Sequence, residues 1–128
     1  MKKKILLIED DLPTIEVYKT GLEEAGFDVD PILTGEEAIR KMEEIDKKPK
    51  EKPDLILLDI VLPDKNGIEV LEKIRSFKNT KDIRVLILSN YSSKELEKKG
   101  FLLKSEKYLM KTDYPPSSLV KLLKKELK

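Results

Sequence analysis

The sequence contains neither cysteine nor histidine. Without cysteine there are no disulfides and no thiol chemistry, which is consistent with a cytoplasmic protein. Without histidine the chain lacks the usual general base, the commonest metal ligand and any phosphohistidine of its own. The apolar run near the start, ILLI, is only four residues long, too short for a signal peptide or a membrane span. We therefore expect a cytoplasmic protein that does not bind membranes.

Charged residues are abundant, but their signs nearly balance. They make up 40% of the 128 residues with a net charge of +1, so the chain has no general attraction to nucleic acid. The balance is uneven, because residues 91–128 hold ten lysines and five acidic residues, which leaves a net charge of −4 for residues 1–90. The length fits one domain over residues 1–128 with a core of its own.

Short apolar runs alternate with stretches of helical periodicity. Residues 4–8, 55–58 and 83–88 predict strands buried on both faces, and residues 108–110 predict a short further strand. Residues 27–33 contain Pro31 and predict an edge strand. Helices are expected over residues 12–25, 34–45, 67–78, about 93–100 and 119–127. This alternation predicts an α/β domain, doubly wound, with a five-stranded parallel sheet and five helices.

Some local features are predicted in more detail. Thr34 and Glu37 have the spacing of a capping box at a helix start. Asp11 is expected to be an acid in the first turn of a helix, where the helix dipole favours it. Residues 46–53, DKKPKEKP, are expected to form an exposed connector rather than a basic interaction patch. Residues 101–107 give no clear pattern.

Polar residues follow the strands at their carboxyl ends. The residues are Glu9, Asp10 and Asp11 after the first strand, Asp59 after the third, Ser89 after the fourth and Lys111 after the fifth. In a parallel sheet these ends share one edge, so the carboxylates should repel and raise one another's pKa values, which a Mg²⁺ ion would relieve. Lys111 adds a charge that can pair with phosphate, and Ser89 adds a hydroxyl. The set suits phosphoryl transfer to Asp59.

The segments KILLIEDD, PDLILLDIVLPDKNG, RVLILSN and KYLMK, in this order, make the whole chain resemble a response-regulator receiver domain of bacterial two-component signalling. The resemblance implies the flavodoxin-like fold of receivers. It also implies Mg²⁺-dependent acceptance of a phosphoryl group by Asp59, with Ser89 and Lys111 as the catalytic residues that contact the group. The implied metal ligands are Asp10, Asp59, the backbone carbonyl of Val61 and, through water, Glu9. Tyr108 would act with Ser89 as the conformational switch.

The resemblance also implies partners. A sensor histidine kinase or a phosphotransfer protein would supply the phosphoryl group. An output protein would dock on the face formed by the helix that ends near residue 100, the strand at 108–110 and the last helix. Because the sequence ends after that helix, we expect a stand-alone regulator without a DNA-binding domain. Its only catalysis would be its own phosphorylation and dephosphorylation, so it is not an enzyme acting on an outside substrate.

The sequence departs from the family pattern at three places. Thr112 follows Lys111 where the family has a proline after a cis bond, and a cis bond before a non-proline residue costs about 2.5–4 kcal/mol, so the loop should have another shape. Asn90 follows Ser89 where a small residue is usual, which is expected to alter the lifetime of the acyl phosphate. The connector at 46–53 is longer than usual.

Two alternatives stay open beside the phosphorylated switch. The first is a degenerate receiver that binds proteins without phosphorylation. The second is a Mg²⁺-dependent phosphatase of the haloacid-dehalogenase type, which needs an aspartate two residues after its nucleophile. Val61 occupies that position and argues against the phosphatase.

Overall fold

The computed structural model describes residues 2–98 and 107–127. Within these residues one parallel sheet has the strand order β2-β1-β3-β4-β5. The strands are β1 (Lys4–Ile8), β2 (Asp28–Ile32), β3 (Leu55–Leu58), β4 (Arg84–Ser89) and β5 (Lys107–Met110). The helices are α1 (Leu12–Glu24), α2 (Gly35–Lys47), α3 (Gly67–Ser76), α4 (Ser93–Lys98) and α5 (Pro116–Glu126), with a 3₁₀ turn, η1, at Pro49–Glu51.

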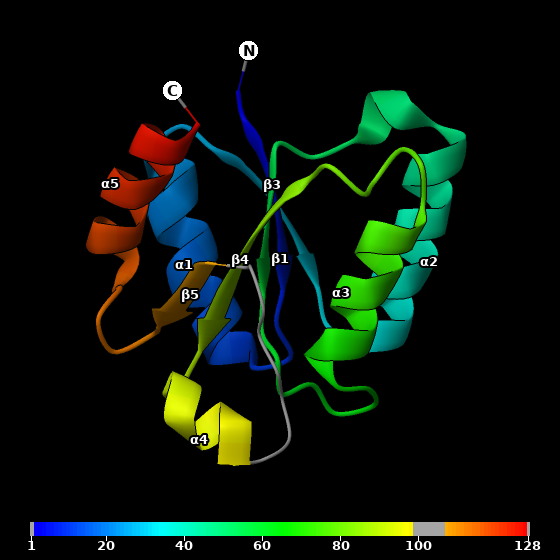
Figure 1. The fold of residues 1–128 in the computed structure, drawn as a ribbon. Helices are drawn as coiled ribbons and strands as arrows, with labels where there is room; N and C mark the ends of the chain where they lie inside the picture. The colour runs from blue at the N-terminus through cyan, green and yellow to red at the C-terminus, as the bar shows by residue number, and fades with distance from the viewer. Residues whose placement is uncertain (1, 99–106, 128) are drawn as a thin grey trace.

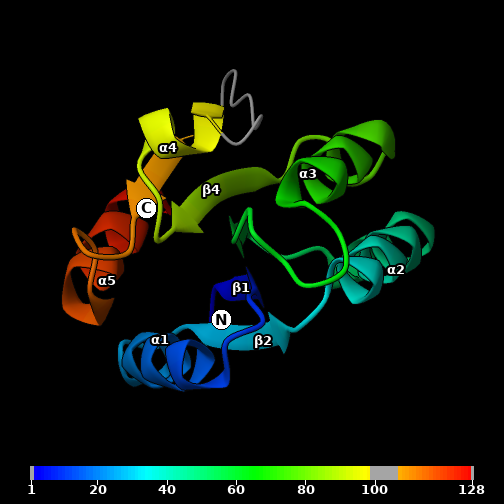
Figure 2. The same ribbon diagram turned by 90° about the horizontal axis from the view of Figure 1, so that it is seen from below.

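The helices cover both faces of the sheet. In Figure 1, α1 and α5 lie on one side of the sheet and α2 and α3 on the other, while α4 lies beside the carboxyl end of β4. Figure 2 looks from that end and shows the same two layers of helices with the sheet between them. The predicted doubly wound α/β fold with a five-stranded parallel sheet is therefore confirmed.

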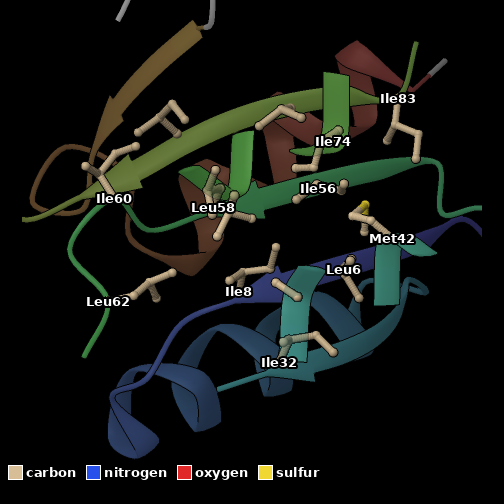
Figure 3. Close-up of a cluster of buried hydrophobic side chains, with 14 of the residues drawn as sticks. Leu6, Ile8, Ile32, Met42, Ile56, Leu58, Ile60, Leu62, Ile74 and Ile83 are labelled. Carbon is tan, nitrogen blue, oxygen red and sulfur yellow. The ribbon is translucent and has the colours of Figure 1, made fainter. Parts of the chain in front are cut away.

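The central strands are apolar on both faces because each face packs against helices. Along β1 and β3, alternate side chains enter different clusters: Leu6 and Ile56 face α2 and α3, whereas Ile5 and Leu55 face α1 and α5. Figure 3 shows the first of these clusters, in which Met42 of α2 meets the strand side chains. Continuous apolar runs are what a strand buried on both faces requires.

Several local predictions are confirmed. The strand containing Pro31 is the sheet edge next to β1, where a residue without an N–H is tolerated. Thr34 caps α2, since its Oγ1 accepts from the Glu37 amide at 3.1 Å. Helix α4 begins at Ser93 as predicted, and Ser92 caps it through the amide of Glu95 at 3.1 Å.

Other predictions need correction. Residues 46–53 are not one irregular connector, because α2 continues through Asp46 and Lys47 and η1 follows. The helix end is held by Asn79, whose amide donates to Asp46 Oδ1 at 3.0 Å, a long-range bond that local composition does not reveal. Asp11 is the N-cap of α1 rather than a first-turn acid. Helix α3 ends at Ser76, two residues earlier than predicted.

The end of the helix predicted to reach Gly100 and the unassigned residues 101–106 lie outside the described part of the chain. Within the described residues, no helix combines the length and the apolar character that crossing a membrane requires.

Candidate functional site

The acids Glu9 and Asp59 extend the two central strands by one residue each. The Asp59 amide donates to the carbonyl of Ile8 at 3.0 Å, and the Glu9 amide donates to the carbonyl of Ile32 at 2.9 Å. The parallel ladder therefore holds both backbones in place beyond the last apolar pair. Both residues are buried, with 3% of Glu9 and 8% of Asp59 exposed.

The three acids Glu9, Asp10 and Asp59 meet at this edge of the sheet. One carboxylate oxygen from each lies within 4.8 Å of the other two, and Asp10 is the exposed member of the set. Carboxylate oxygens in such a group are the hard ligands that Mg²⁺ prefers, and one or two carboxylates usually hold it together with water and substrate phosphate. The residues present therefore fit a magnesium site, as the sequence predicted.

Lys111 joins the acidic group from the end of β5. Its ammonium group forms an ion pair with Glu9 and lies 3.5 Å from Asp59 Oδ2. Its amide donates to the carbonyl of Ser89 at 2.8 Å, so the lysine backbone is tied to the end of β4. Only 9% of the lysine side chain is exposed, and the cation faces the acids rather than solvent.

The pKa values of Asp10, Asp59 and Lys111 are all raised above their ordinary values. Burial, and then the charge of Glu9, raise the pKa of Asp59 to about 7, although Lys111 and the amide of Val61 oppose the shift. Burial also raises the pKa of Asp10. Burial acts against the charged form of Lys111, but Glu9 and Asp59 outweigh it and raise the pKa of the lysine. Repulsion between carboxylates was the predicted cause of such shifts, yet burial is the larger cause for both aspartates.

Ser89 and Tyr108 lie on the face of the sheet that α3 and α4 cover. Ser89 is fully buried, and its hydroxyl accepts from the amide of Tyr91 at 3.1 Å. The Tyr108 ring packs against the cluster of Figure 3, and its hydroxyl is buried without a hydrogen-bond partner among the described residues. Burial raises the pKa of this hydroxyl. The Ser89 hydroxyl is near enough to lower the pKa in part, although the two hydroxyls do not have the geometry of a hydrogen bond.

The loop between β3 and α3 begins at Asp59 and folds back on it. The Val61 amide donates to Asp59 Oδ1 at 3.2 Å, which orients the carboxylate, and Val61 itself is 39% exposed. Gly67 closes the loop with a bond of 2.6 Å to the carbonyl of Ile60. A Cβ at Gly67 would lie 2.6 Å from the carbonyl oxygen of Asp59, so only glycine allows this approach.

Sequence reasoning missed the residues that hold this loop at its ends. Asn66 caps α3, with Oδ1 accepting from the amide of Ile68 at 2.7 Å. Asp64 caps the neighbouring helix α2 through the amides of Gly35 and Glu36 at 2.8 and 2.9 Å. Asparagine followed by glycine is a local turn signal, but nothing local marks Asp64 as a cap of a helix 28 residues away.

The loop after Lys111 also differs from the family pattern as expected. The described backbone contains no cis peptide bond, so Lys111 and Thr112 are joined in trans.

The site residues predicted after the strands all lie at this edge of the sheet. They are Glu9, Asp10, Asp59, Ser89 and Lys111.

A family model of the response regulator receiver domain matches residues 5–124. The chain belongs to the response regulator receiver domain family. It is 39% identical over 111 residues to the probable transcriptional regulatory protein SilR of Salmonella typhimurium, an alignment that covers 84% of this chain and 44% of SilR. The chain spans about half or less of the length of the curated relatives it matches.

Solved structures agree with this membership. The response regulator receiver domain protein (CheY-like) of Methanospirillum hungatei superposes with a TM-score of 0.79 at 32% identity, covering 99% of this chain and 94% of that one. The receiver domain of the sensor histidine kinase PA1611 of Pseudomonas aeruginosa gives a TM-score of 0.82 at 23% identity, covering 98% and 97%. That structure has a magnesium ion coordinated in its active-site cleft.

The family fixes the general role. Receiver domains are the phosphorylation-accepting domains of two-component response regulators, and they bind Mg²⁺ at an acidic site. They are signalling domains rather than classical enzymes, and they interact with histidine kinases or phosphotransfer proteins.

Proposed function

We propose that Asp59 accepts a phosphoryl group from the phosphohistidine of a sensor histidine kinase or a phosphotransfer protein. The observation that carries the proposal is the position of the Asp59 carboxylate, which lies among Glu9 and Asp10 with the Lys111 ammonium 3.5 Å away. An oxygen nucleophile beside a cation and a group of metal-binding acids is the arrangement that phosphoryl transfer requires, because positioning and charge neutralisation supply most of its catalysis.

The transfer exchanges one bond to phosphorus for another. An oxygen of Asp59 bonds to phosphorus while the bond from phosphorus to the donor histidine breaks, and the histidine nitrogen keeps the electron pair. Lys111 balances the negative charge of the phosphoryl group, and the Val61 amide at 3.2 Å orients the attacking carboxylate. The ligands for Mg²⁺ would be Asp10, Asp59, the Val61 carbonyl and, through water, Glu9. When bound, the ion would neutralise charge on the phosphoryl oxygens.

The new group changes the charge at the site and so biases the conformation. A phosphoryl group carries about −1.5 to −2 charges near neutral pH. In our proposal the Ser89 hydroxyl donates a hydrogen bond to the phosphoryl group. Tyr108, on the same face of the sheet, then moves together with Ser89. The two residues thus transmit phosphorylation to α4 and β5 by shifting an existing equilibrium.

The output is proposed to be the docking of a partner protein on the face formed by α4, β5 and α5. The elements of this face contain several exposed lysines, of which Lys107 is paired with Glu126: Lys94, Lys98, Lys107, Lys121, Lys124 and Lys125. A partner with an acidic surface would match it.

The deciding experiment measures the intact mass of the protein after incubation with acetyl phosphate, with and without Mg²⁺. We expect the wild type to gain one phosphoryl group only with Mg²⁺, and Asp59→Asn to gain none. The matched control is Asp54→Asn at the other end of the same strand, where the carboxylate accepts from the Lys4 amide at 2.7 Å. No gain in folded wild-type protein would instead favour the degenerate receiver that binds partners without phosphorylation.

A further inference from the structure

A tyrosine from α1 holds the loop that follows Lys111. Tyr18 is buried, with 5% exposed, and packs in the cluster between α1, α5 and the sheet. Its hydroxyl donates to the carbonyl of Tyr114 at 2.7 Å and lies 3.5 Å from the carbonyl of Lys111. Most buried hydroxyls have hydrogen-bond partners, and the partners of Tyr18 are main-chain carbonyls of the loop between β5 and α5.

The loop itself is a tight turn around the lysine. The amide of Asp113 donates to the carbonyl of Met110 at 3.0 Å, and the amide of Tyr114 donates to the carbonyls of Met110 and Lys111 at 3.2 and 3.3 Å. The two carbonyls near the Tyr18 hydroxyl are therefore the ends of one turn. Fixing Tyr114 fixes the turn, and the turn carries the Lys111 backbone.

A second contact on the same face of α1 holds the start of α5. Gly21 lies three residues after Tyr18, and a Cβ at this position would be 2.7 Å from Cβ of Pro116. The absence of a side chain thus lets the first residue of α5 pack directly against α1. Positions i and i+3 of a helix lie on one face. Tyr18 and Gly21 together set the distance between α1 and the whole segment from Lys111 to Pro116.

We propose that Tyr18 is a positioning residue for Lys111 in phosphoryl transfer, an inference that rests on the proposed function of Asp59. Lysine has a long flexible side chain, so its ammonium group is placed only as well as its backbone is. The Lys111 amide is fixed by the Ser89 carbonyl at 2.8 Å, and Tyr18 fixes the loop beyond it. These two anchors hold the ammonium between Glu9 and Asp59.

The test compares Tyr18→Phe with wild type in the rate of phosphorylation by acetyl phosphate at saturating Mg²⁺, followed by intact mass. Because small misplacements of catalytic groups are costly, we expect the rate to fall about tenfold. The Mg²⁺ affinity, measured by calorimetry, should not fall, since the acidic ligands do not depend on the loop. Thr20→Val, which removes a hydroxyl from the exposed side of α1, is the control and should behave as wild type.

A double-mutant cycle separates positioning from general damage. If Tyr18 acts through Lys111, then Tyr18→Phe should cause no further loss of rate in a Lys111→Met background. Thermal melts show whether each variant is folded. Should Tyr18→Phe fail to fold, Gly21→Ala, which displaces Pro116 and leaves the tyrosine in place, is expected to slow the reaction in the same Lys111-dependent way.

The possible results distinguish the positioning role of Tyr18 from the proposed function of Asp59. A wild-type rate in Tyr18→Phe, a loss of Mg²⁺ affinity that matches the loss of rate, or an equal loss in the Lys111→Met background would overturn the positioning role and leave the proposed function intact. A wild type that takes up no phosphoryl group would overturn the proposed function and this inference with it.

Discussion

The ammonium group of Lys111 forms a buried ion pair with Glu9, whereas Asp59 Oδ2 lies 3.5 Å from it. The side chains of Lys111 and Glu9 are 9% and 3% exposed, so neither charge is stabilised by bulk water. Burying such charges is tolerated only when they are paired. The lysine therefore offsets part of the negative charge that the three acids collect at the end of the sheet.

We predict that Lys111→Met binds Mg²⁺ at least about tenfold more tightly than wild type, because the lysine cation no longer opposes the ion at the acidic group. The same variant should be phosphorylated about 10²-fold more slowly, because a charge that stabilises the transferring group is lost. Calorimetry and intact mass measure the two effects. Lys107→Met, in which an exposed lysine that pairs with Glu126 is removed, is the control. Weaker Mg²⁺ binding in Lys111→Met would contradict the role assigned to the ion pair.

The raised pKa of Asp59 predicts how stability depends on pH when a chelator removes divalent ions. The pKa is about 7 in the folded protein against an ordinary value of 3.8. Between these values the folded protein binds more protons than the unfolded chain, so the free energy of unfolding falls as pH rises. The expected loss from pH 4 to 8 is on the order of 2–4 kcal/mol. Hydrogen bonds lower the pKa values of the exposed carboxylates of Asp11 and Asp64. These two groups therefore affect the free energy of unfolding only at more acid pH.

Urea unfolding at several pH values measures this dependence. Asp59→Asn should flatten the curve over that range, because an amide does not titrate. Saturating Mg²⁺ should raise the stability of the wild type most at the alkaline end, where Asp59 is ionised. A wild-type curve that rises from pH 5 to 8 in the presence of chelator would show that another group dominates.

The sheet and the convergence of the site residues could be predicted from the sequence because they follow from local patterns. Apolar runs mark the buried strands, and in a parallel sheet the residues that end them, such as Asp59 and Lys111, must share an edge. Thr34 is similarly local, since its cap depends on a residue three positions away.

Several features that escaped prediction depend on contacts between distant residues. Asp64 caps α2, Asn79 holds the end of α2, and Tyr18 reaches the loop after Lys111. In each case a polar side chain bonds to a distant backbone group, and no pattern of neighbouring residues distinguishes it from a solvated one. The main cause of the Asp59 pKa shift, burial, is likewise a property of the assembled domain.

Gly67 is expected to be the least replaceable glycine next to the site. A Cβ there would lie 2.6 Å from both the Asp59 carbonyl oxygen and the Ile60 Cα, which are backbone atoms that cannot move without displacing Asp59. At Gly35 the nearest atom would be a side-chain carbon of Lys65, at 2.9 Å. We predict that Gly67→Ala lowers the melting temperature more than Gly35→Ala does, and that it slows phosphorylation at least about tenfold.

Melting curves and intact-mass time courses on the two glycine variants give the comparison. Phosphorylation of Gly67→Ala should remain slow even at temperatures where the variant is fully folded, because the displaced group is the backbone of Asp59, the proposed acceptor. Equal melting temperatures and equal rates for the two variants would mean that the loop over Asp59 relaxes more easily than its backbone contacts imply.

Tyr108 offers a test of the switch that is separate from the chemistry. Its hydroxyl is buried without a partner among the described residues, and burying an unpaired hydroxyl costs stability. We therefore predict that Tyr108→Phe leaves the unphosphorylated protein as stable as wild type or slightly more stable. The rate of phosphorylation of Tyr108→Phe should stay within about twofold of the wild-type rate, because in our proposal Tyr108 does not take part in the transfer of the phosphoryl group. Beryllofluoride with Mg²⁺ can stand in for the phosphoryl group. If the Tyr108 hydroxyl gains a partner only after phosphorylation, the rise in melting temperature that this analogue causes should be smaller in Tyr108→Phe than in wild type. If the rise in melting temperature and the binding of partners are the same in Tyr108→Phe and wild type, the Tyr108 hydroxyl has no role in the switch and the residue only packs in the core.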